Sequence, residues 1–280
     1  MLKAYYQIIK PGIIYGNILT TIAGYLMACD LHLDLKSFVG AVIGFCLVIG
    51  SACTLNNLAD RSIDANMERT KKRPSVTGVI SLKAGLIYAS VLLGGGVVLL
   101  VLFTNITTLV VGLVGFVVYV SAYTYSKRKT DLATLIGSVS GATPIVGGYT
   151  AFAGHFTLTA LIIGMMMLVW QMPHFYAIAI YREKEYRRAK IPVLPITSGY
   201  KTTSYWMVFY SFLFLLLSVS LYVYGPVGIA YLLVMSVVGA LWLAFNLKGL
   251  FLKTFAGWAK QDFRYSLIVL LVMSLMIALR

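Results

Sequence analysis

Long runs of apolar residues, separated by short polar stretches, dominate the hydrophobic pattern along the chain. A helix needs roughly 20 apolar residues to cross a bilayer core about 30 Å thick. The pattern therefore predicts nine transmembrane helices, at residues 12–30, 37–58, 83–104, 106–126, 132–152, 158–180, 203–224, 226–247 and 265–280. The last run is the shortest, which is typical of a tilted or peripheral helix.

The composition favours a polytopic membrane protein of the all-α class. Of the 280 residues, 60% are hydrophobic and 11% are charged, and the mean hydropathy is +0.87. A soluble domain carries roughly 25% charged residues, so this surplus of apolar side chains exceeds what one globular core can bury. Cys29, Cys46 and Cys53 lie in apolar runs without metal-ligand spacing, which argues against a disulfide framework or a structural zinc site.

The positions of the basic residues predict the topology. If the N-terminus is cytoplasmic, 21 of the 23 Lys and Arg residues fall in cytoplasmic segments, and only Lys36 and Arg280 lie outside. This is the positive-inside pattern, so we expect a cytoplasmic N-terminus. Basic loops also explain the net charge of +14, which therefore does not indicate a nucleic-acid partner. The absence of an Arg- and Ser-rich transit peptide favours a bacterial plasma (inner) membrane.

Acidic residues are concentrated in two of the cytoplasmic segments. Five of the nine Asp and Glu residues lie in segments 59–82 and 181–201, which follow the second and sixth predicted spans. These two spans are four helices apart and point in the same direction. We therefore expect one membrane-embedded domain over residues 1–280, with two four-helix halves around a central cavity and functional segments at 56–82 and 170–201.

Asn56, Asp60 and Asp64 are spaced four residues apart at the end of the second span. If the helix continues through them, their side chains form one stripe of oxygen atoms on a single face. Like charges four residues apart repel each other, so a counter-ion is expected. Two carboxylates and an amide oxygen are hard ligands that suit Mg²⁺, which completes its shell with water and substrate phosphates. The stripe therefore predicts a magnesium site.

A group of basic residues, Arg69, Lys72 and Arg73, follows the acidic stripe. Guanidinium groups bind phosphate oxygens in bidentate fashion, and an ammonium group supplies a point charge. Lys127 and Arg128, after the fourth span, are further candidates for this role. Acids for a metal beside bases for phosphate indicate a diphosphate headgroup on an apolar tail. The alternative is a solvated loop whose charges only set the topology.

Polar residues also interrupt the inner end of the sixth span. Gln171 and His174 lie there on either side of Pro173, at a depth where polar groups usually face a cavity or a partner. The alternative for His174 is an imidazole satisfied by a neighbouring carbonyl. Tyr181 and Glu185, again four residues apart, follow in the next segment.

Aromatic side chains near these segments are candidates for a pocket that stabilises a carbocation. Tyr123 in the fourth span, and Phe175 and Tyr176 in the sixth, carry rings whose faces attract a cation. Packing or an interfacial belt is the more common role of such aromatics. Gly137 and Gly141 in the fifth span are spaced for close helix packing, and we expect that role for them.

These segments resemble a known family. Residues 56–74, NNLADRSIDANMERTKKRP, are similar to the first aspartate motif of the UbiA-type intramembrane prenyltransferases. Residues 170–177, WQMPHFYA, and 191–195, IPVLP, resemble the haem branch of that superfamily, the protohaem IX farnesyltransferases or haem O synthases. The resemblance covers nearly the whole chain. The broader superfamily carries a second DxxxD pair after its sixth helix. The corresponding positions here are Tyr181 and Glu185, so only one carboxylate remains and the sequence does not predict a second Mg²⁺.

The resemblance implies transfer of a farnesyl group from farnesyl diphosphate to a vinyl group of haem b, which gives haem O and diphosphate. Mg²⁺ on Asp60, Asp64 and Asn56 would then offset the charge on the departing diphosphate. Haem A synthase and the terminal oxidase assembly are candidate partners, and the bilayer would hold the isoprenoid chain. The acceptor side would be formed by His174, Gln171, Tyr181 and Glu185.

Two other functions are compatible with part of this pattern. A prenyltransferase that acts on an aromatic quinone or chlorophyll precursor would share the first motif, but the surroundings of His174 argue against it. A membrane transporter would line its path with similar polar groups. The transporter is disfavoured because the acids lie at the cytoplasmic ends of the helices rather than near the midplane.

Overall fold

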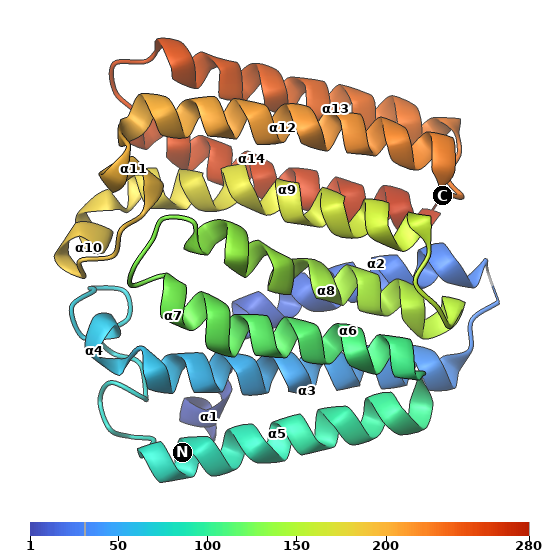
Figure 1. Cartoon of the computed structure of the whole chain (residues 1–280), viewed down its shortest axis with the longest axis horizontal. Helices are drawn as coiled ribbons and strands as arrows, with labels where there is room; N and C mark the ends of the chain where they lie inside the picture. Colours follow the sequence, from blue (N-terminus) through green and yellow to red (C-terminus); the bar gives the residue numbers. More distant parts are fainter. Residues whose placement is uncertain (31, 280) are drawn as a thin grey trace.

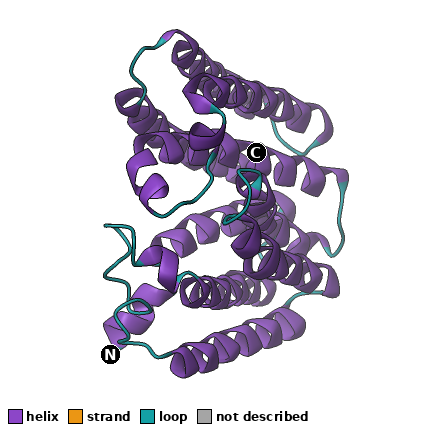
Figure 2. Cartoon of the chain, turned by 60° about the vertical axis from the view of Figure 1, so that its left-hand side comes forward, coloured by secondary structure: helices purple, strands orange, loops and turns teal. Residues whose placement is uncertain are grey.

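The computed structural model describes residues 1–30 and 32–279, which form helices and loops and contain no strand. Long helices lie side by side and run from one end of the molecule to the other (Figure 1). Loops and short helices connect them at the two ends (Figure 2). The elements are α1 (Leu2–Ile8), α2 (Pro11–Cys29), α3 (Leu35–Ala59), α4 (Arg61–Asp64), α5 (Leu82–Phe103), α6 (Ile106–Val117), the π-helix η1 (Val118–Tyr123), α7 (Thr124–Ser126), α8 (Ala133–Ala153), α9 (Leu158–Tyr181), α10 (Glu183–Arg188), α11 (Leu194–Thr197), α12 (Gly199–Tyr224), α13 (Ile229–Lys248), the 3₁₀-helix η2 (Gly249–Phe251) and α14 (Ala256–Leu279).

Eight of the described helices are long and apolar enough to cross a membrane. They are α2, α3, α5, the run Ile106–Ser126, α9, α12, the run Ile229–Phe251 and α14. The remaining predicted run, residues 132–152, forms α8, which has 21 residues but is rich in Gly, Ser and Thr. Most of its residues from Ala142 to Ala151 are buried, so its small side chains serve packing inside the bundle. The count of nine crossing helices stays a prediction.

The last helix differs from its prediction. α14 begins at Ala256 rather than at residue 265 and has 24 residues. Lys260, Asp262 and Arg264 interrupt the apolar pattern of its first turns and conceal its start. Lys260 and Arg264 are exposed, whereas the buried Asp262 accepts a hydrogen bond from Trp242 Nε1 at 2.9 Å. Because α14 packs against α2, α9 and α13, it is neither short nor peripheral.

Side-chain caps determine where several of these helices begin. Asp34, Ser81 and Thr157 each accept a hydrogen bond from a backbone N–H in the first turn of α3, α5 and α9. Such caps satisfy donors that the helix itself leaves unpaired. Asn105 caps α6 in the same way, so the predicted break between the third and fourth spans is confirmed.

Two glycines allow α2 and α8 to cross at close range. A Cβ on Gly24 would lie 2.0 Å from Ile145 O, and one on Gly148 would lie 1.9 Å from Thr21 O. Backbone atoms cannot yield to a side chain, so only glycine fits these positions. α2 is the first long helix of the first predicted half, and α8 is the first helix of the second. α3 packs on α2 and α5, and α9 packs on α8 and α12, so the arrangement of the first three long helices repeats in the second half.

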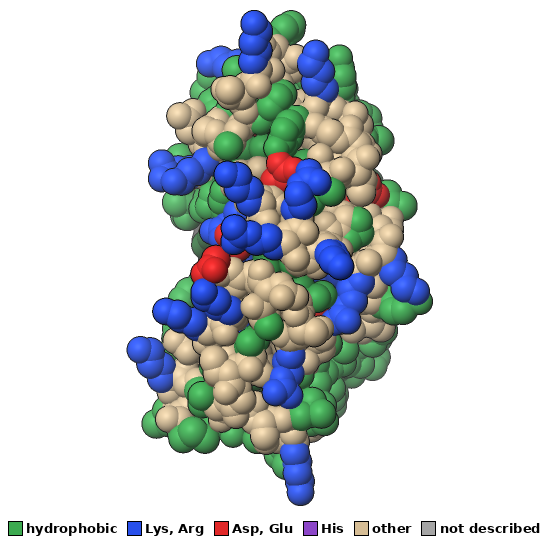
Figure 3. All heavy atoms as spheres, turned by 90° about the vertical axis from the view of Figure 1, so that its left-hand side faces the viewer, with side chains coloured by type: hydrophobic (Ala, Val, Ile, Leu, Met, Phe, Trp, Pro, Cys, Tyr) green, Lys and Arg blue, Asp and Glu red, His purple; other side chains and the backbone are tan. Residues whose placement is uncertain are grey.

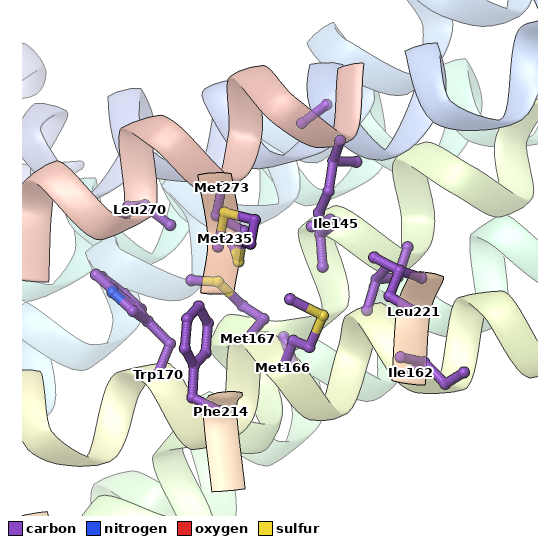
Figure 4. Packing of buried hydrophobic residues seen from close by; sticks show 14 of the residues in the cluster. Ile145, Ile162, Met166, Met167, Trp170, Phe214, Leu221, Met235, Leu270 and Met273 are labelled. Atoms are coloured by element: carbon purple, nitrogen blue, oxygen red, sulfur yellow. The ribbon is translucent and has the colours of Figure 1, made fainter. Parts of the chain in front are cut away.

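A large apolar core holds the second half together. Met166, Met167 and Trp170 of α9 are buried with Phe214 of α12 and Met235 of α13 (Figure 4). Lipid tails are as apolar as these side chains, so close van der Waals packing is what holds helices together in such a core. This core fixes α9, whose last turns carry the second motif segment.

Charged side chains gather at one end of the bundle. The end that carries α4, α7 and α10 presents many Lys and Arg side chains, with a few acidic side chains between them (Figures 1 and 3). Both functional segments predicted from the sequence reach this end. Lys36 lies in the first turn of α3, at the opposite end of that helix from α4, and Arg280 lies outside the described residues. The predicted cytoplasmic orientation of the charged end stays a prediction.

Candidate active site

The three predicted metal ligands follow one another along a single helical path. α3 ends at Ala59, yet the backbone N–H of Asp60 donates to Asn56 O at 2.9 Å, and that of Asp64 donates to Asp60 O at 2.8 Å. This four-residue spacing keeps the three side chains on one face. All three are buried, since 2% of Asn56 and 4% each of Asp60 and Asp64 are exposed. The stripe predicted from the sequence is therefore present.

The two carboxylates of the stripe are paired with predicted phosphate-binding bases. Lys127 Nζ forms an ion pair with Asp60 Oδ2, and Arg128 Nη2 lies 3.8 Å from Asp60 Oδ1. Arg73 Nη1 donates to Asp64 Oδ2 at 2.6 Å. An unpaired buried carboxylate would be strongly destabilising, so these cations allow both acids to be buried.

Lys10 completes the cluster, although it was not among the site residues predicted from the sequence. Its Nζ donates to Asn56 Oδ1 at 2.5 Å, while Asn56 Nδ2 donates to Thr124 Oγ1 at 2.9 Å. Lys10 precedes Pro11 in the left-handed region, with φ 55°, where the chain turns from α1 into α2. Burial lowers the pKa of Lys10 to about 8, because the charged form loses its hydration.

Asn57 links the N-terminal helix to the same cluster. Its Nδ2 donates to Ile8 O at 2.6 Å, and its Oδ1 accepts from Arg73 Nη1 at 3.0 Å. Arg73 is therefore held by Asn57 and Asp64 together. The four-residue spacing could not reveal this role, because Asn57 points about 100° around the helix from Asn56.

Two stacked tyrosines lie beside the cluster, in the π-helix η1. The Tyr119 and Tyr123 ring centroids are 5.2 Å apart with an interplanar angle of 21°. Lys10 Nζ lies 5.8 Å from the Tyr119 centroid, and Lys127 Nζ lies 5.4 Å from the Tyr123 centroid. Each ring thus lies within cation–π distance of an ammonium group, so its surroundings already suit a positive charge. π-helical turns are frequent at functional sites.

The second functional segment approaches the first through α9 and α10. Tyr181 is the last residue of α9, and Glu185 lies in α10. Arg182 between them donates to Tyr181 Oη at 3.1 Å and to Glu185 Oε1 at 3.3 Å. Burial raises the pKa of Tyr186, and the positive charge of Arg69 partly opposes this shift. Arg69 of the first segment therefore lies near Tyr186 of the second.

Arg69 and Lys72 complete the predicted phosphate-binding set at the surface. Both are exposed, and within the described residues neither forms an ion pair. The hydrogen bond from Lys71 lowers the pKa of Glu68, and the charge of Lys72 adds to this effect. Arg69 and Lys72 are thus available to a ligand, whereas Arg73 is held inside the cluster.

Gln171 is buried against α8, beside a glycine of the predicted pair. Its Nε2 donates to Ser138 O at 2.9 Å. A Cβ on Gly141 would lie 2.0 Å from Gln171 Oε1, and one on Gly137 would lie 2.7 Å from the Tyr123 ring. Both glycines lie where α8 packs against α9 and η1, as expected. The space that they leave is filled by Gln171 and Tyr123, two predicted site residues.

His174 is buried between α9 and α14. Its Nδ1 is hydrogen-bonded to Ser266 Oγ at 2.7 Å, and its ring stacks on Trp170 with centroids 4.8 Å apart. Trp170 Nε1 donates to Ser266 O at 2.9 Å, which fixes the same turn of α14. The partner of the imidazole is thus a hydroxyl group rather than a carbonyl.

Two predicted pocket aromatics lie apart from the acidic stripe. Tyr176 is buried in the core between α9 and α12, with its ring centroid 6.4 Å from that of Tyr210. Phe175 is 42% exposed on the surface of α9. Neighbouring residues of a helix point about 100° apart, so His174, Phe175 and Tyr176 cannot share one face. Tyr123 is the predicted aromatic that lies within the cluster.

Comparison with known proteins decides the family. Residues 17–268 match the model of the UbiA prenyltransferase family. The chain belongs to this family. Similar proteins include the protoheme IX farnesyltransferase of Yersinia pseudotuberculosis serotype O:1b, 42% identical over 279 residues, 99% of this chain and 95% of the relative. The protein of that name from Photorhabdus laumondii is 42% identical over 280 residues, 100% of this chain and 95% of the relative.

Solved structures of UbiA homologues share the fold. A structure described as digeranylgeranylglyceryl phosphate synthase in membranes aligns with a TM-score of 0.84 at 21% identity, over 99% of this chain and 97% of the other. A UbiA homologue from Archaeoglobus fulgidus bound to GPP and Mg²⁺ aligns with a TM-score of 0.69 at 14% identity, over 95% and 99%. These likenesses show the fold. Together with its apolar helices, family membership makes the chain a multi-pass membrane prenyltransferase.

The donor set of this UbiA-family site fits a divalent metal that keeps few protein ligands. Asn56, Asp60 and Asp64 offer oxygen atoms only, and the described part of the chain contains no cluster of three or more His, Cys, Asp or Glu. Asp60 Oδ1 is buried and has no hydrogen-bond partner among the described residues. A site with few protein ligands, all of them oxygen atoms, suits Mg²⁺, because substrate phosphates and water supply its other ligands.

Proposed function

We propose that this UbiA-family enzyme transfers the farnesyl group of farnesyl diphosphate to a vinyl group of protohaem IX, giving haem O and diphosphate. The observation that carries the proposal is the 42% identity, over 99% of the chain, to proteins named protoheme IX farnesyltransferase. The buried acidic stripe, surrounded by basic side chains, supports a diphosphate substrate. We place the protein in the bacterial plasma membrane with its charged end in the cytosol.

The acidic stripe and the bases around it would bind the diphosphate. Mg²⁺ held by Asp60, Asp64 and Asn56 supplies positive charge to the phosphate oxygens of the leaving group. Arg69 and Lys72 lie exposed at the same end and donate to the same oxygens. Donors that are already in position where charge develops lower the barrier without reorganisation. The remaining donors of this set are Arg73, Lys127 and Arg128.

The aromatic side of the cluster would hold the reacting carbon. Loss of diphosphate leaves an allylic cation, which the stacked rings of Tyr119 and Tyr123 stabilise through their faces. The vinyl π electrons of haem attack this cation and form the new C–C bond. The carbocation left on the other vinyl carbon takes up a water molecule, which loses a proton and becomes the hydroxyl group of haem O, so no strong base is needed for the attack. The farnesyl chain lies among apolar side chains toward the bilayer.

The second functional segment would form the acceptor side. Glu185 Oε2 is buried without a hydrogen-bond partner among the described residues. This carboxylate oxygen can therefore accept a hydrogen bond from a substrate. His174, Gln171 and Tyr181 lie in the last turns of α9. We assign these four residues to the positioning of haem.

The test is haem extraction from a bacterial host that lacks haem O synthesis and expresses this chain. We expect haem O in the extract, identified by mass. Asp60→Asn and Asp64→Asn should abolish it, because each removes a charge needed for the metal. Glu68→Gln is the matched control, since Glu68 pairs with Lys71 on the surface, and it should leave haem O unchanged. A prenylated quinone precursor in place of haem O would contradict the proposal.

A further inference from the structure

Each of the three proposed metal ligands is in contact with a cationic side chain of this chain. Lys127 pairs with Asp60, Arg73 with Asp64 at 2.6 Å, and Lys10 with the Asn56 oxygen at 2.5 Å. A metal ion that binds these oxygen atoms must therefore replace cations that already neutralise them.

The two lysines are easier to displace than the arginine. Arg73 is fixed by a second hydrogen bond, to Asn57 at 3.0 Å. Lys127 is bonded to Asp60 alone, and the second contact of Lys10, to Tyr119 Oη, is 3.4 Å long. A lysine also carries its charge on a flexible stem of four carbons, so it can reach a new partner without movement of the backbone.

The charge balance of the cluster decides what can displace them. Two carboxylates face Lys10, Arg73 and Lys127, with Arg128 nearby, so the cluster carries excess positive charge. A divalent metal alone would increase this excess in a poorly solvated site, which is unfavourable. A diphosphate that enters with the metal supplies the anion to which the displaced ammonium groups can turn.

We propose that Lys10 and Lys127 exchange partners during binding, from the metal ligands to the diphosphate, and so make metal and diphosphate bind cooperatively. This inference rests on the proposed function and adds Lys10 to the residues that contact the diphosphate. By thermodynamic linkage, each ligand then raises the affinity of the other by the same factor.

The experiment measures two affinities on the full chain in lipid nanodiscs. Binding of Mn²⁺ alone is followed by electron paramagnetic resonance, and binding of labelled inorganic pyrophosphate is followed with and without Mn²⁺. For the unaltered chain we expect weak binding of Mn²⁺ alone and a gain in pyrophosphate affinity of about tenfold or more when Mn²⁺ is present. No gain would overturn the proposal, whatever the variants show.

Lys10→Met and Lys127→Met should move the two affinities in opposite directions. We expect Mn²⁺ alone to bind about fivefold more tightly, because no ammonium group has to leave, and pyrophosphate with Mn²⁺ to bind about tenfold more weakly. Lys129→Met, an exposed neighbour that contacts Tyr125, is the control and should change neither. A lysine variant that is merely damaged would bind both Mn²⁺ and pyrophosphate more weakly. Either that result or unchanged binding of Mn²⁺ alone would overturn the proposed exchange of partners.

Failure of this proposal can be told apart from failure of the proposed function. Cooperative binding with opposite lysine effects, but without haem O formation, would support the exchange and refute the acceptor. Haem O formation without the opposite lysine effects would refute the exchange and support the function.

Discussion

The two acidic segments of this protein use their charges in different ways. In the first, buried Asp60 and Asp64 are paired with basic side chains from other elements, and the Lys127 partner of Asp60 lies 67 residues away. In the second, Glu183 and Glu185 are paired with Arg187 and Arg182 within the same short turn, at i,i+4 and i,i+3. Local pairs on an exposed helix contribute little, whereas buried pairs between distant segments persist only where the whole fold supports them.

This difference assigns separate tasks to the two segments. The first is a preformed charged cluster, closed by contributions from the start of α2, the end of α7 and the loop before α5. The second is a surface helix whose carboxylate oxygens bind Arg182, Arg187 and Tyr200 of α12, with the buried Glu185 Oε2 as the exception. The following predictions test this contrast.

The largest effect is expected on activity. Asp64→Ala should lower haem O formation by purified enzyme at least about a hundredfold, because it removes a charge at the leaving group. Glu183→Ala should leave the rate within about twofold, since its partners are Arg187 and Tyr200. Equal losses in the two variants would show that the two segments do not differ in this way.

The next effect concerns stability. Arg73→Met leaves buried Asp64 without its cation and should destabilise the protein by about 3 kcal/mol. Arg187→Met removes an exposed local pair and should cost about 0.5 kcal/mol or less. Thermal unfolding of both variants in the same detergent gives the comparison. Similar unfolding temperatures would mean that Asp64 does not need its partner.

A smaller effect is expected at the exception in the second segment. Glu185→Gln keeps the shape of the side chain and removes its charge, so we expect a loss of about tenfold in activity with no change in unfolding temperature. Measurement of kcat and KM for haem separates binding from turnover. A Glu185→Gln enzyme with normal kinetics would place this carboxylate outside the acceptor side.

The smallest effect is a pH dependence at Glu183. Hydrogen bonds from Tyr200 and Arg187 lower the pKa of Glu183, so the folded state binds this proton less readily than the unfolded chain. These bonds therefore stabilise the folded protein at pH values above the ordinary pKa of a carboxyl group. This stabilisation is lost as the pH falls through the lowered pKa of Glu183. Glu183→Gln should lower the unfolding temperature slightly at pH 7 and leave it unchanged near pH 3. An equal decrease at both values would contradict this linkage.

Much of this structure could be predicted from local patterns, in which the residues concerned are close together in the sequence. Apolar runs placed the nine long helices of the described chain, and the four-residue spacing of Asn56, Asp60 and Asp64 placed three side chains on one face. The pattern also placed α8 to within one residue, although α8 carries small residues and is packed inside the bundle. It missed the start of α14 by nine residues, because buried Asp262 and its charged neighbours interrupt the apolar run there.

The partners of the site residues could not be predicted, because they depend on tertiary contacts. Nothing in the local sequence shows that Lys10 reaches Asn56 across 46 residues. The orientation of Tyr176 toward α12 likewise depends on how α9 is rotated in the bundle. The sequence therefore indicated candidate site residues more readily than which of them face each other.

The most direct test of the central claim is a structure of the enzyme with farnesyl thiodiphosphate, a slowly reacting analogue, and Mn²⁺. The account predicts that the metal binds Asp60 and Asp64 and that the two phosphates lie among Lys10, Arg73 and Lys127. A headgroup bound at α10, with Asp60 and Asp64 still paired to their basic partners, would contradict it.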